Sequence, residues 1–202
     1  MKKGLFRCVV IAALMVFLSV GSAMADDGKN FISNKVGVGY QGMVAGSFLN
    51  GLSVRGWVTD RVGLELNGFY GKVDEKIYEG GYGRTDLDAD LWMIEAKAMY
   101  AFISRNYSKF YAGAKVGYGH TDASDNSGGG GPASTINGTS FWAPGVFIGS
   151  EWSFPQLPEV GFNFDVGYTW FLYDNKLSED PYVYMDLDVQ GISATFGIHY
   201  YF

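Results

Sequence analysis

Cysteine is nearly absent from this sequence, in which Cys8 is the only one. Cys8 lies near the N-terminus, within the segment that we assign below to a leader, so the mature protein has no thiol. Disulfide-stapled folds and cysteine-based metal or nucleophile chemistry are therefore excluded. Proline is also scarce, with 5 in 202 residues, whereas glycine (29) and aromatic residues (17%) are abundant. This composition is typical of a membrane barrel and also of a secreted β-sandwich.

Long apolar runs are missing except for one at the N-terminus. Three basic residues precede an apolar segment over residues 9–20, and Ala23-Met24-Ala25 follows it. A basic start, a short apolar run and a small-residue cleavage site define a secretory signal peptide, and the run is too short to span a bilayer as a helix. We predict a signal peptide at residues 1–25 and one domain at residues 26–202. A retained N-terminal anchor is the alternative.

Basic residues are in the minority, with 15 Lys and Arg against 21 Asp and Glu and a net charge of −6. The predicted signal peptide contains three of the basic residues and no acidic one, so the mature chain has a net charge of −9. The mature sequence has no basic stretch to meet a phosphate backbone. Nucleic acid is therefore not an expected partner.

Alternation of apolar and polar residues indicates long β-strands. From Val160 to Leu172 every even position is apolar, whereas the odd positions from Gly161 to Thr169 are glycine or polar. Period-two alternation indicates a strand, and a strand of a sandwich is usually about half as long. The same pattern occurs in seven further segments: Val36–Gly42, Leu52–Val58, Val62–Gly71, Trp92–Phe102, Lys109–Thr121, Trp142–Phe154 and Ile192–Phe202.

The links between these eight segments alternate in length. Short links are expected at Thr59–Arg61, Ser104–Ser108 and Pro155–Pro158, and longer links at Ala45–Gly51, Val73–Asp86, Asp122–Gly138 and Asp174–Pro181. If the chain starts in the periplasm, every short link is periplasmic and every longer link extracellular, as in outer-membrane barrels. We therefore predict an all-β fold, an eight-stranded antiparallel up-and-down transmembrane β-barrel.

The charged residues indicate which face of each strand meets lipid. A charge at mid-membrane on the lipid face costs up to about 2–4 kcal/mol, so charges belong inside. The expected lumen charge network consists of Arg55, Glu65, Glu95, Lys97, Lys115, Glu151 and Asp165, with Asn163 beside them. Eight strands enclose a space only wide enough for side chains, where unpaired charges are costly. A filled, sealed lumen is favoured, and an ion path gated by rearranged pairs is the alternative.

The last segment ends in Phe202 and places Phe196, Ile198 and Tyr200 on the same apolar face. A terminal Phe after alternating apolar residues resembles the signal by which outer-membrane barrels are recognised for assembly. With the strand number, the chain resembles the small OmpA/OmpX-type outer-membrane β-barrels over residues 35–202, and we expect no peptidoglycan-binding domain. The resemblance implies the bacterial outer membrane as location. It implies outer-membrane lipid, lipopolysaccharide and the barrel-assembly machinery as partners.

Enzymatic activity requires a nucleophile, a base and an orienting group that meet in space. Only two histidines are present, of which His199 lies near the periplasmic end and His120 at the extracellular rim. His120 precedes Asp122 and Ser124, but these three would meet only through a chance loop conformation. We therefore expect no enzyme, no cofactor and no metal site. A lipid-modifying outer-membrane enzyme is the least favoured alternative.

In two acidic runs, residues 86–90 and 186–188, the aspartates fall on the even positions that face lipid further along the same strands. We expect them to extend strands above the bilayer, or a β-bulge to reset the phase. A divalent cation bound between lipopolysaccharide phosphates is the less favoured interpretation. The expected function is a structural or interaction barrel that presents four extracellular loops to an unknown ligand. A narrow channel for ions or very small solutes is the main alternative.

Overall fold

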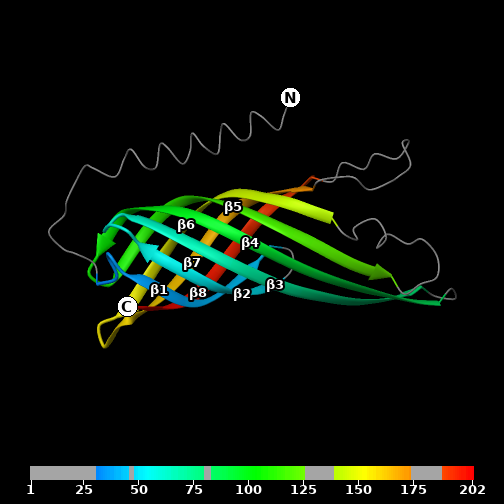
Figure 1. Ribbon diagram of the computed structural model, residues 1–202, viewed down its shortest axis with the longest axis horizontal. Helices are drawn as coiled ribbons and strands as arrows, with labels where there is room; N and C mark the ends of the chain where they lie inside the picture. Colours follow the sequence, from blue (N-terminus) through cyan, green and yellow to red (C-terminus); the bar gives the residue numbers. More distant parts are fainter. Residues whose placement is uncertain (1–30, 46–47, 80–82, 126–138, 174–187) are drawn as a thin grey trace, which may run out of the picture.

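The computed structural model describes residues 31–45, 48–79, 83–125, 139–173 and 188–202. Eight strands pair antiparallel in sequence order, and the last closes on the first to form a barrel (Figure 1). The strands are β1 (Val36–Val44), β2 (Phe48–Trp57), β3 (Val62–Glu79), β4 (Gly83–Arg105), β5 (Ser108–Asp125), β6 (Thr139–Phe154), β7 (Leu157–Tyr173) and β8 (Asp188–Tyr201). The described residues include no helix long and apolar enough to cross a membrane.

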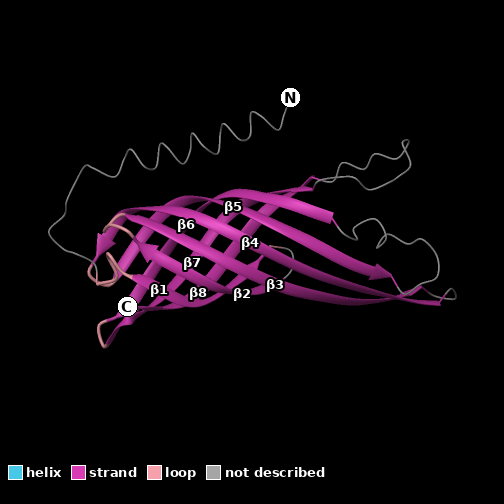
Figure 2. Cartoon of the chain, in the orientation of Figure 1, coloured by secondary structure: helices cyan, strands magenta, loops and turns pink. Residues whose placement is uncertain are grey.

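The predicted eight-stranded antiparallel barrel is confirmed, and each predicted segment falls on one strand to within a residue. Short turns at residues 58–61, 106–107 and 155–156 lie at the end of the barrel that holds the C-terminus (Figure 2). We call this end the periplasmic end and the opposite one the extracellular end. The predicted signal peptide at residues 1–25 lies outside the described residues.

The predicted link Val73–Asp86 is wrong, because most of it belongs to strands. β3 continues to Glu79, β4 begins at Gly83, and β5 runs on through Asp125. The acidic run 86–90 pairs with β3 and β5 without a register shift, so it is a strand extension and not a bulge. Beyond the bilayer both faces of a hairpin meet water, so the alternation is lost while the backbone pairing continues. The run 186–188 lies mostly outside the described residues.

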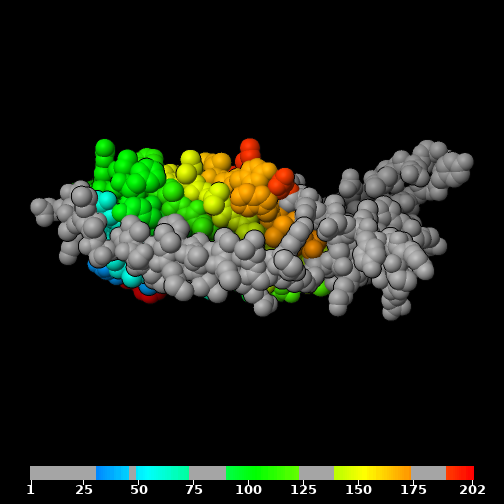
Figure 3. All heavy atoms as spheres, turned by 90° about the horizontal axis from the view of Figure 1, so that it is seen from above, coloured from blue at the N-terminus to red at the C-terminus, as the bar shows by residue number. Residues whose placement is uncertain are grey.

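Within the barrel wall, burial alternates from one residue to the next. On β3, Glu65 is 4% exposed, whereas Leu64 and Leu66 are 50% and 54% exposed. The outward residues form a broad apolar surface. In the space-filling view, side chains of the green to orange strands form the upper part of the face that is shown (Figure 3). Polar residues inside and apolar residues outside invert the order of a water-soluble domain, as expected for a barrel whose outer face meets lipid.

Two groups of buried apolar side chains fill the lumen near its ends. The lower apolar layer, toward the periplasmic end, consists of Ile32, Trp57, Met99, Ala101, Tyr111, Phe147 and Tyr201. The upper apolar layer, toward the extracellular end, consists of Met43, Leu49, Phe69, Met93, Phe141 and Ala143. Most of the predicted lumen charges lie between these layers, whereas Glu151 lies at the level of the lower layer, where it contacts Trp57 and Tyr201. Polar contacts in the middle of the lumen are therefore enclosed by apolar packing above and below.

The segment that precedes β1 closes the periplasmic mouth. Ile32 is 3% exposed within the lower apolar layer, and the Asn34 amide donates to the Trp57 carbonyl at 2.7 Å. Asn34 has a φ of 62°, in the left-handed region that asparagine tolerates better than most residues. This turn directs the chain from the lumen into the wall at Val36.

Candidate functional site

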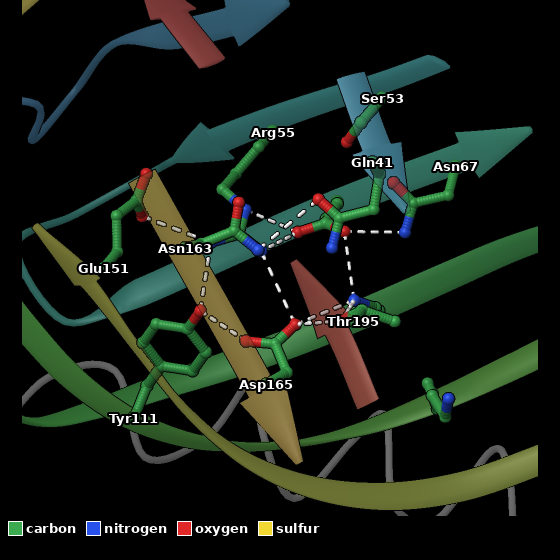
Figure 4. Close-up of polar contacts among 12 residues, drawn as sticks. Gln41, Ser53, Arg55, Asn67, Tyr111, Glu151, Asn163, Asp165 and Thr195 are labelled. Carbon is green, nitrogen blue, oxygen red and sulfur yellow. Dashed lines mark hydrogen bonds and ion pairs between the residues drawn. The ribbon is translucent and has the colours of Figure 1, made fainter. Parts of the chain in front are cut away.

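Arg55 is the centre of the lumen charge network, and its side chain is fully buried. Its guanidinium donates to Glu65 on the neighbouring strand and, across the lumen, to the Tyr111 hydroxyl at 3.0 Å and Glu151 at 3.3 Å. Asp165 lies 3.7 Å away. These groups come from β2, β3, β5, β6 and β7. The side chains of Arg55, Tyr111, Glu151 and Asp165 point toward one another (Figure 4). One planar cation thus joins five strands through the middle of the barrel.

Lys97 makes the second hub of the network. Its ammonium donates to Asp165 at 2.8 Å and to the Thr195 hydroxyl at 3.1 Å, and it lies 3.1 Å from Glu65. Asp165 also accepts from Tyr111 at 2.6 Å and from Thr195 at 2.9 Å. Arg55 and Lys97 both contact Glu65 and Asp165, so the two hubs form one connected cluster.

Lys115 and Glu95 extend the network toward the extracellular end. The Lys115 ammonium lies 3.1 Å from one Glu95 oxygen and donates to the Ser193 hydroxyl at 3.3 Å. Asn67 donates to the other Glu95 oxygen at 3.2 Å. The gap between Lys97, Lys115 and the surrounding side chains is too small for a water molecule. At this level, side chains fill the space between Lys97, Lys115 and Asp165.

All seven predicted lumen charges lie inside the barrel with at most 6% exposure, as does Asn163. They comprise three cations and four anions, and neutral donors compensate the excess. Glu151 accepts from the Trp57 indole at 2.7 Å and from the Tyr201 hydroxyl. Trp57 and Tyr111 were not among the predicted members of the network. The alternation on each strand places both residues on the inner face. Their residue types alone do not indicate that they form hydrogen bonds with buried charges.

A second polar cluster holds the periplasmic mouth together. The buried Lys109 ammonium donates to Asp60 at 3.0 Å, to the Ser104 hydroxyl at 2.9 Å and to the Ser33 hydroxyl at 3.1 Å. Ser33 in turn donates to Asp60 at 2.6 Å. Lys109 thereby fastens the N-terminal segment to the turn at residues 58–61 and to the periplasmic end of β4.

The two histidines lie in different surroundings. His199 is fully buried in the lumen, with Nε2 2.8 Å from the Ser53 hydroxyl. His120 lies on the outer face of β5, with Nε2 3.2 Å from Asp122 and Nδ1 3.0 Å from the Ser140 hydroxyl on β6. The side chain of Ser124 lies outside the described residues. The serine that His120 contacts was missed because it lies on the neighbouring strand, twenty positions along the chain.

The last strand places Phe196, Ile198, Tyr200 and Phe202 on the outer face, between 40% and 69% exposed. The Phe202 amide donates to the Val36 carbonyl at 3.0 Å, so the terminal residue still belongs to the seam between β8 and β1. Aromatic residues also gather on the outer face near the extracellular end, where the Tyr118 ring lies 5.1 Å from Trp142 and 6.0 Å from Trp92. Such rings suit the level of lipid headgroups.

A metal site formed by three or more His, Cys, Asp or Glu side chains is not found among the described residues. The cation site suggested for the acidic runs involves side chains outside that part of the chain, except Asp90. The Asp90 carboxylate accepts a hydrogen bond from Tyr70 at 2.8 Å.

No family model and no curated protein matches the chain. Among solved structures, OprG from Pseudomonas aeruginosa is similar with a TM-score of 0.53 and 15% identity over 87% of this chain and 99% of that one. A major outer membrane protein from Thermus thermophilus is similar with a TM-score of 0.50 and 14% identity over 83% of this chain and 98% of that one. At this identity the likeness establishes the fold: the chain is a small eight-stranded barrel of the outer-membrane type.

Proposed function

We propose that the protein is a structural or interaction barrel of the bacterial outer membrane, with a side-chain-filled lumen that does not conduct. The observation that carries the proposal is the layered interior, in which a paired charge network lies between two apolar layers. An aqueous pore would need polar, hydrated side chains at both mouths. Here Phe141 and Met93 cover the network on the extracellular side, and Trp57 and Ile32 on the periplasmic side.

The outer surface supports the membrane location. Apolar side chains face outward on all eight strands and are largely exposed. An apolar belt of this extent is rare on a water-soluble monomer and marks a surface that contacts lipid or a partner. Outer-membrane lipid and lipopolysaccharide are the partners that fit this belt and its aromatic rim. The signal peptide proposed at residues 1–25 supplies the route of export.

The extracellular connections would supply any specific interaction. The three-stranded wall β3–β4–β5 rises beyond the pairing of β2, which ends at Tyr70 on β3. A platform of this kind presents its outer end above the lipid. We assign no ligand to it, because the connections themselves lie outside the described residues.

Planar-bilayer recording of the purified barrel tests the proposal. The sealed lumen predicts no stable single-channel steps in symmetric salt. Glu95→Gln and Lys115→Met serve as reporters, because the two residues form a buried ion pair on the lumen side of β4 and β5. Steps in the wild-type protein that change in size or selectivity with these variants would overturn the sealed lumen and support the narrow channel instead.

A further inference from the structure

On the outer face of the barrel, a histidine contacts a serine through one ring nitrogen and an aspartate through the other. Ser140 on β6 is the direct cross-strand partner of His120 on β5, and their side chains meet with Oγ 3.0 Å from Nδ1. Asp122 lies two residues beyond His120 on the same face, with Oδ1 3.2 Å from Nε2. The neighbouring Tyr118 donates its hydroxyl proton to Ser140 at 3.2 Å. We call these four residues the rim cluster.

The contacts fit one tautomer of the neutral imidazole. A carboxylate only accepts hydrogen bonds, so the Nε2 that faces Asp122 carries the proton. The opposite nitrogen, Nδ1, then has a free lone pair and accepts from the Ser140 hydroxyl. A serine hydroxyl on one imidazole nitrogen and a carboxylate on the other is the arrangement that activates a serine oxygen for attack, with the histidine as base and the aspartate as the group that orients it. Here the serine meets Nδ1 and the aspartate Nε2, the reverse of the serine-protease triad.

The position of the rim cluster indicates the substrate. Trp92 lies opposite His120 in the β4–β5 ladder, and its ring centroid is 6.2 Å from the imidazole. Trp142 and Tyr118, each two residues from a member of the pair, are 47% and 39% exposed on the lipid-facing surface. Aromatic belts mark the headgroup level, where the ester groups of membrane amphiphiles lie. The Asp122 side chain, 62% exposed, lies on the water side of this belt.

We propose that the rim cluster hydrolyses carboxylic esters of lipid amphiphiles presented from the surrounding leaflet. Ser140 Oγ bonds to the ester carbonyl carbon while its proton passes to His120 Nδ1. The carbon–alkoxy bond then breaks, His120 returns the proton to the leaving alcohol, and an acyl-serine remains. Water, deprotonated by His120, attacks the acyl carbon and releases the carboxylic acid and the free serine. The Tyr118 hydroxyl lies beside Ser140 Oγ and can donate a hydrogen bond to the carbonyl oxygen of the ester, which becomes negatively charged in the tetrahedral intermediate.

The rim cluster contains Ser140 in place of Ser124, the serine considered from the sequence, and so supplies the convergent groups that were not expected there. It is independent of the sealed lumen, because all four residues lie on the outer face. The structure separates their roles. Ser140 and His120 act on the reacting atoms, whereas Asp122 is a positioning residue.

The test uses the full mature barrel, refolded in detergent micelles, with a fluorophosphonate probe and a medium-chain p-nitrophenyl ester. We expect the probe to label Ser140, and Ser140→Ala to abolish both labelling and hydrolysis. His120→Gln should lower the hydrolysis rate by about 10²-fold or more, the usual contribution of a general base. Asp122→Asn should lower kcat with little change in KM, because its side chain does not touch the substrate. Ser150→Ala is the matched control, since Ser150 lies on the same strand and the same face.

A second measurement does not depend on turnover. The mature chain has no cysteine, so Ser140→Cys introduces a single thiol. We expect this thiol to react with iodoacetamide faster than it does in the Ser140→Cys, His120→Gln double variant, with circular dichroism confirming the barrel in both. Equal alkylation rates, or labelling and hydrolysis that persist in Ser140→Ala, would overturn the proposal and leave the rim cluster as a polar contact between β5 and β6.

Discussion

The inner and outer faces of the same strands are stabilised in different ways. Inside, Arg55, Lys97 and Asp165 are held by specific hydrogen bonds from several strands. Outside, neighbours such as Leu66 and Val54 are half exposed, and their side chains need no specific hydrogen-bond partner. One face therefore depends on complementary partners, and the other only on being apolar. A substitution should be tolerated or not according to which of these two requirements it breaks.

Arg55→Met gives the largest expected effect on the inner face. The change leaves Glu65 and Glu151 buried without their main cation, and removing one partner of a buried pair typically costs about 3–5 kcal/mol. Urea unfolding in lipid vesicles measures the loss. The double variant with Glu65→Leu should recover part of it. No recovery would mean that the arginine acts through packing and not through its charge pairs.

Leu66→Lys tests the outer face at mid-height, where Leu66 pairs with Val54 and Ala96. A lysine at the bilayer midplane is expected to cost about 2–4 kcal/mol, and one near an interface about 0–1 kcal/mol. Val58→Lys, at the periplasmic end, is the matched control. The same unfolding assay should show the difference in vesicles. Equal losses for the two variants would contradict the assignment of the membrane-embedded belt.

Glycine substitutions sharpen the comparison without introducing charge. A Cβ at Gly149, on the inner face, would lie 2.2 Å from Asp165 Oδ1 and 2.6 Å from the Tyr111 ring, whereas nothing lies within 4 Å of a Cβ at Gly68 on the outer face. We expect Gly149→Ala to cost about 1–3 kcal/mol through overpacking. Gly68→Ala should be neutral or stabilise by up to about 1 kcal/mol, because alanine loses less backbone freedom. A larger loss at Gly68 would contradict its open surroundings.

Deletion of Phe202 should have the smallest effect on the folded barrel. Its side chain is 69% exposed on the outer face, and its amide makes one hydrogen bond to the Val36 carbonyl. If the terminal residue acts as an assembly signal, the amount of barrel in the outer membrane of cells should fall, while the refolded protein unfolds at nearly the same urea concentration. Equal surface levels of the two forms would speak against that role.

The alternating parity of the sequence determined the strand number, the pairing order and which charged residues lie inside, because period two places successive side chains on opposite faces. It failed at residues 73–86, where water on both sides of the hairpin removes the alternation. The alternation also did not predict which residues pair within the lumen. The partners of Arg55 lie up to 96 positions away in the sequence, and alternation within one strand carries no information about them.

The sequence by itself thus determined a barrel with a polar interior and an apolar exterior. Only the tertiary structure decided which side chains meet. Closure of β8 on β1 brings Tyr201 to Glu151, and the register of β5 against β6 brings Ser140 to His120. The physical reason is that parity specifies the direction of a side chain, whereas the height of each residue in the wall depends on inter-strand register.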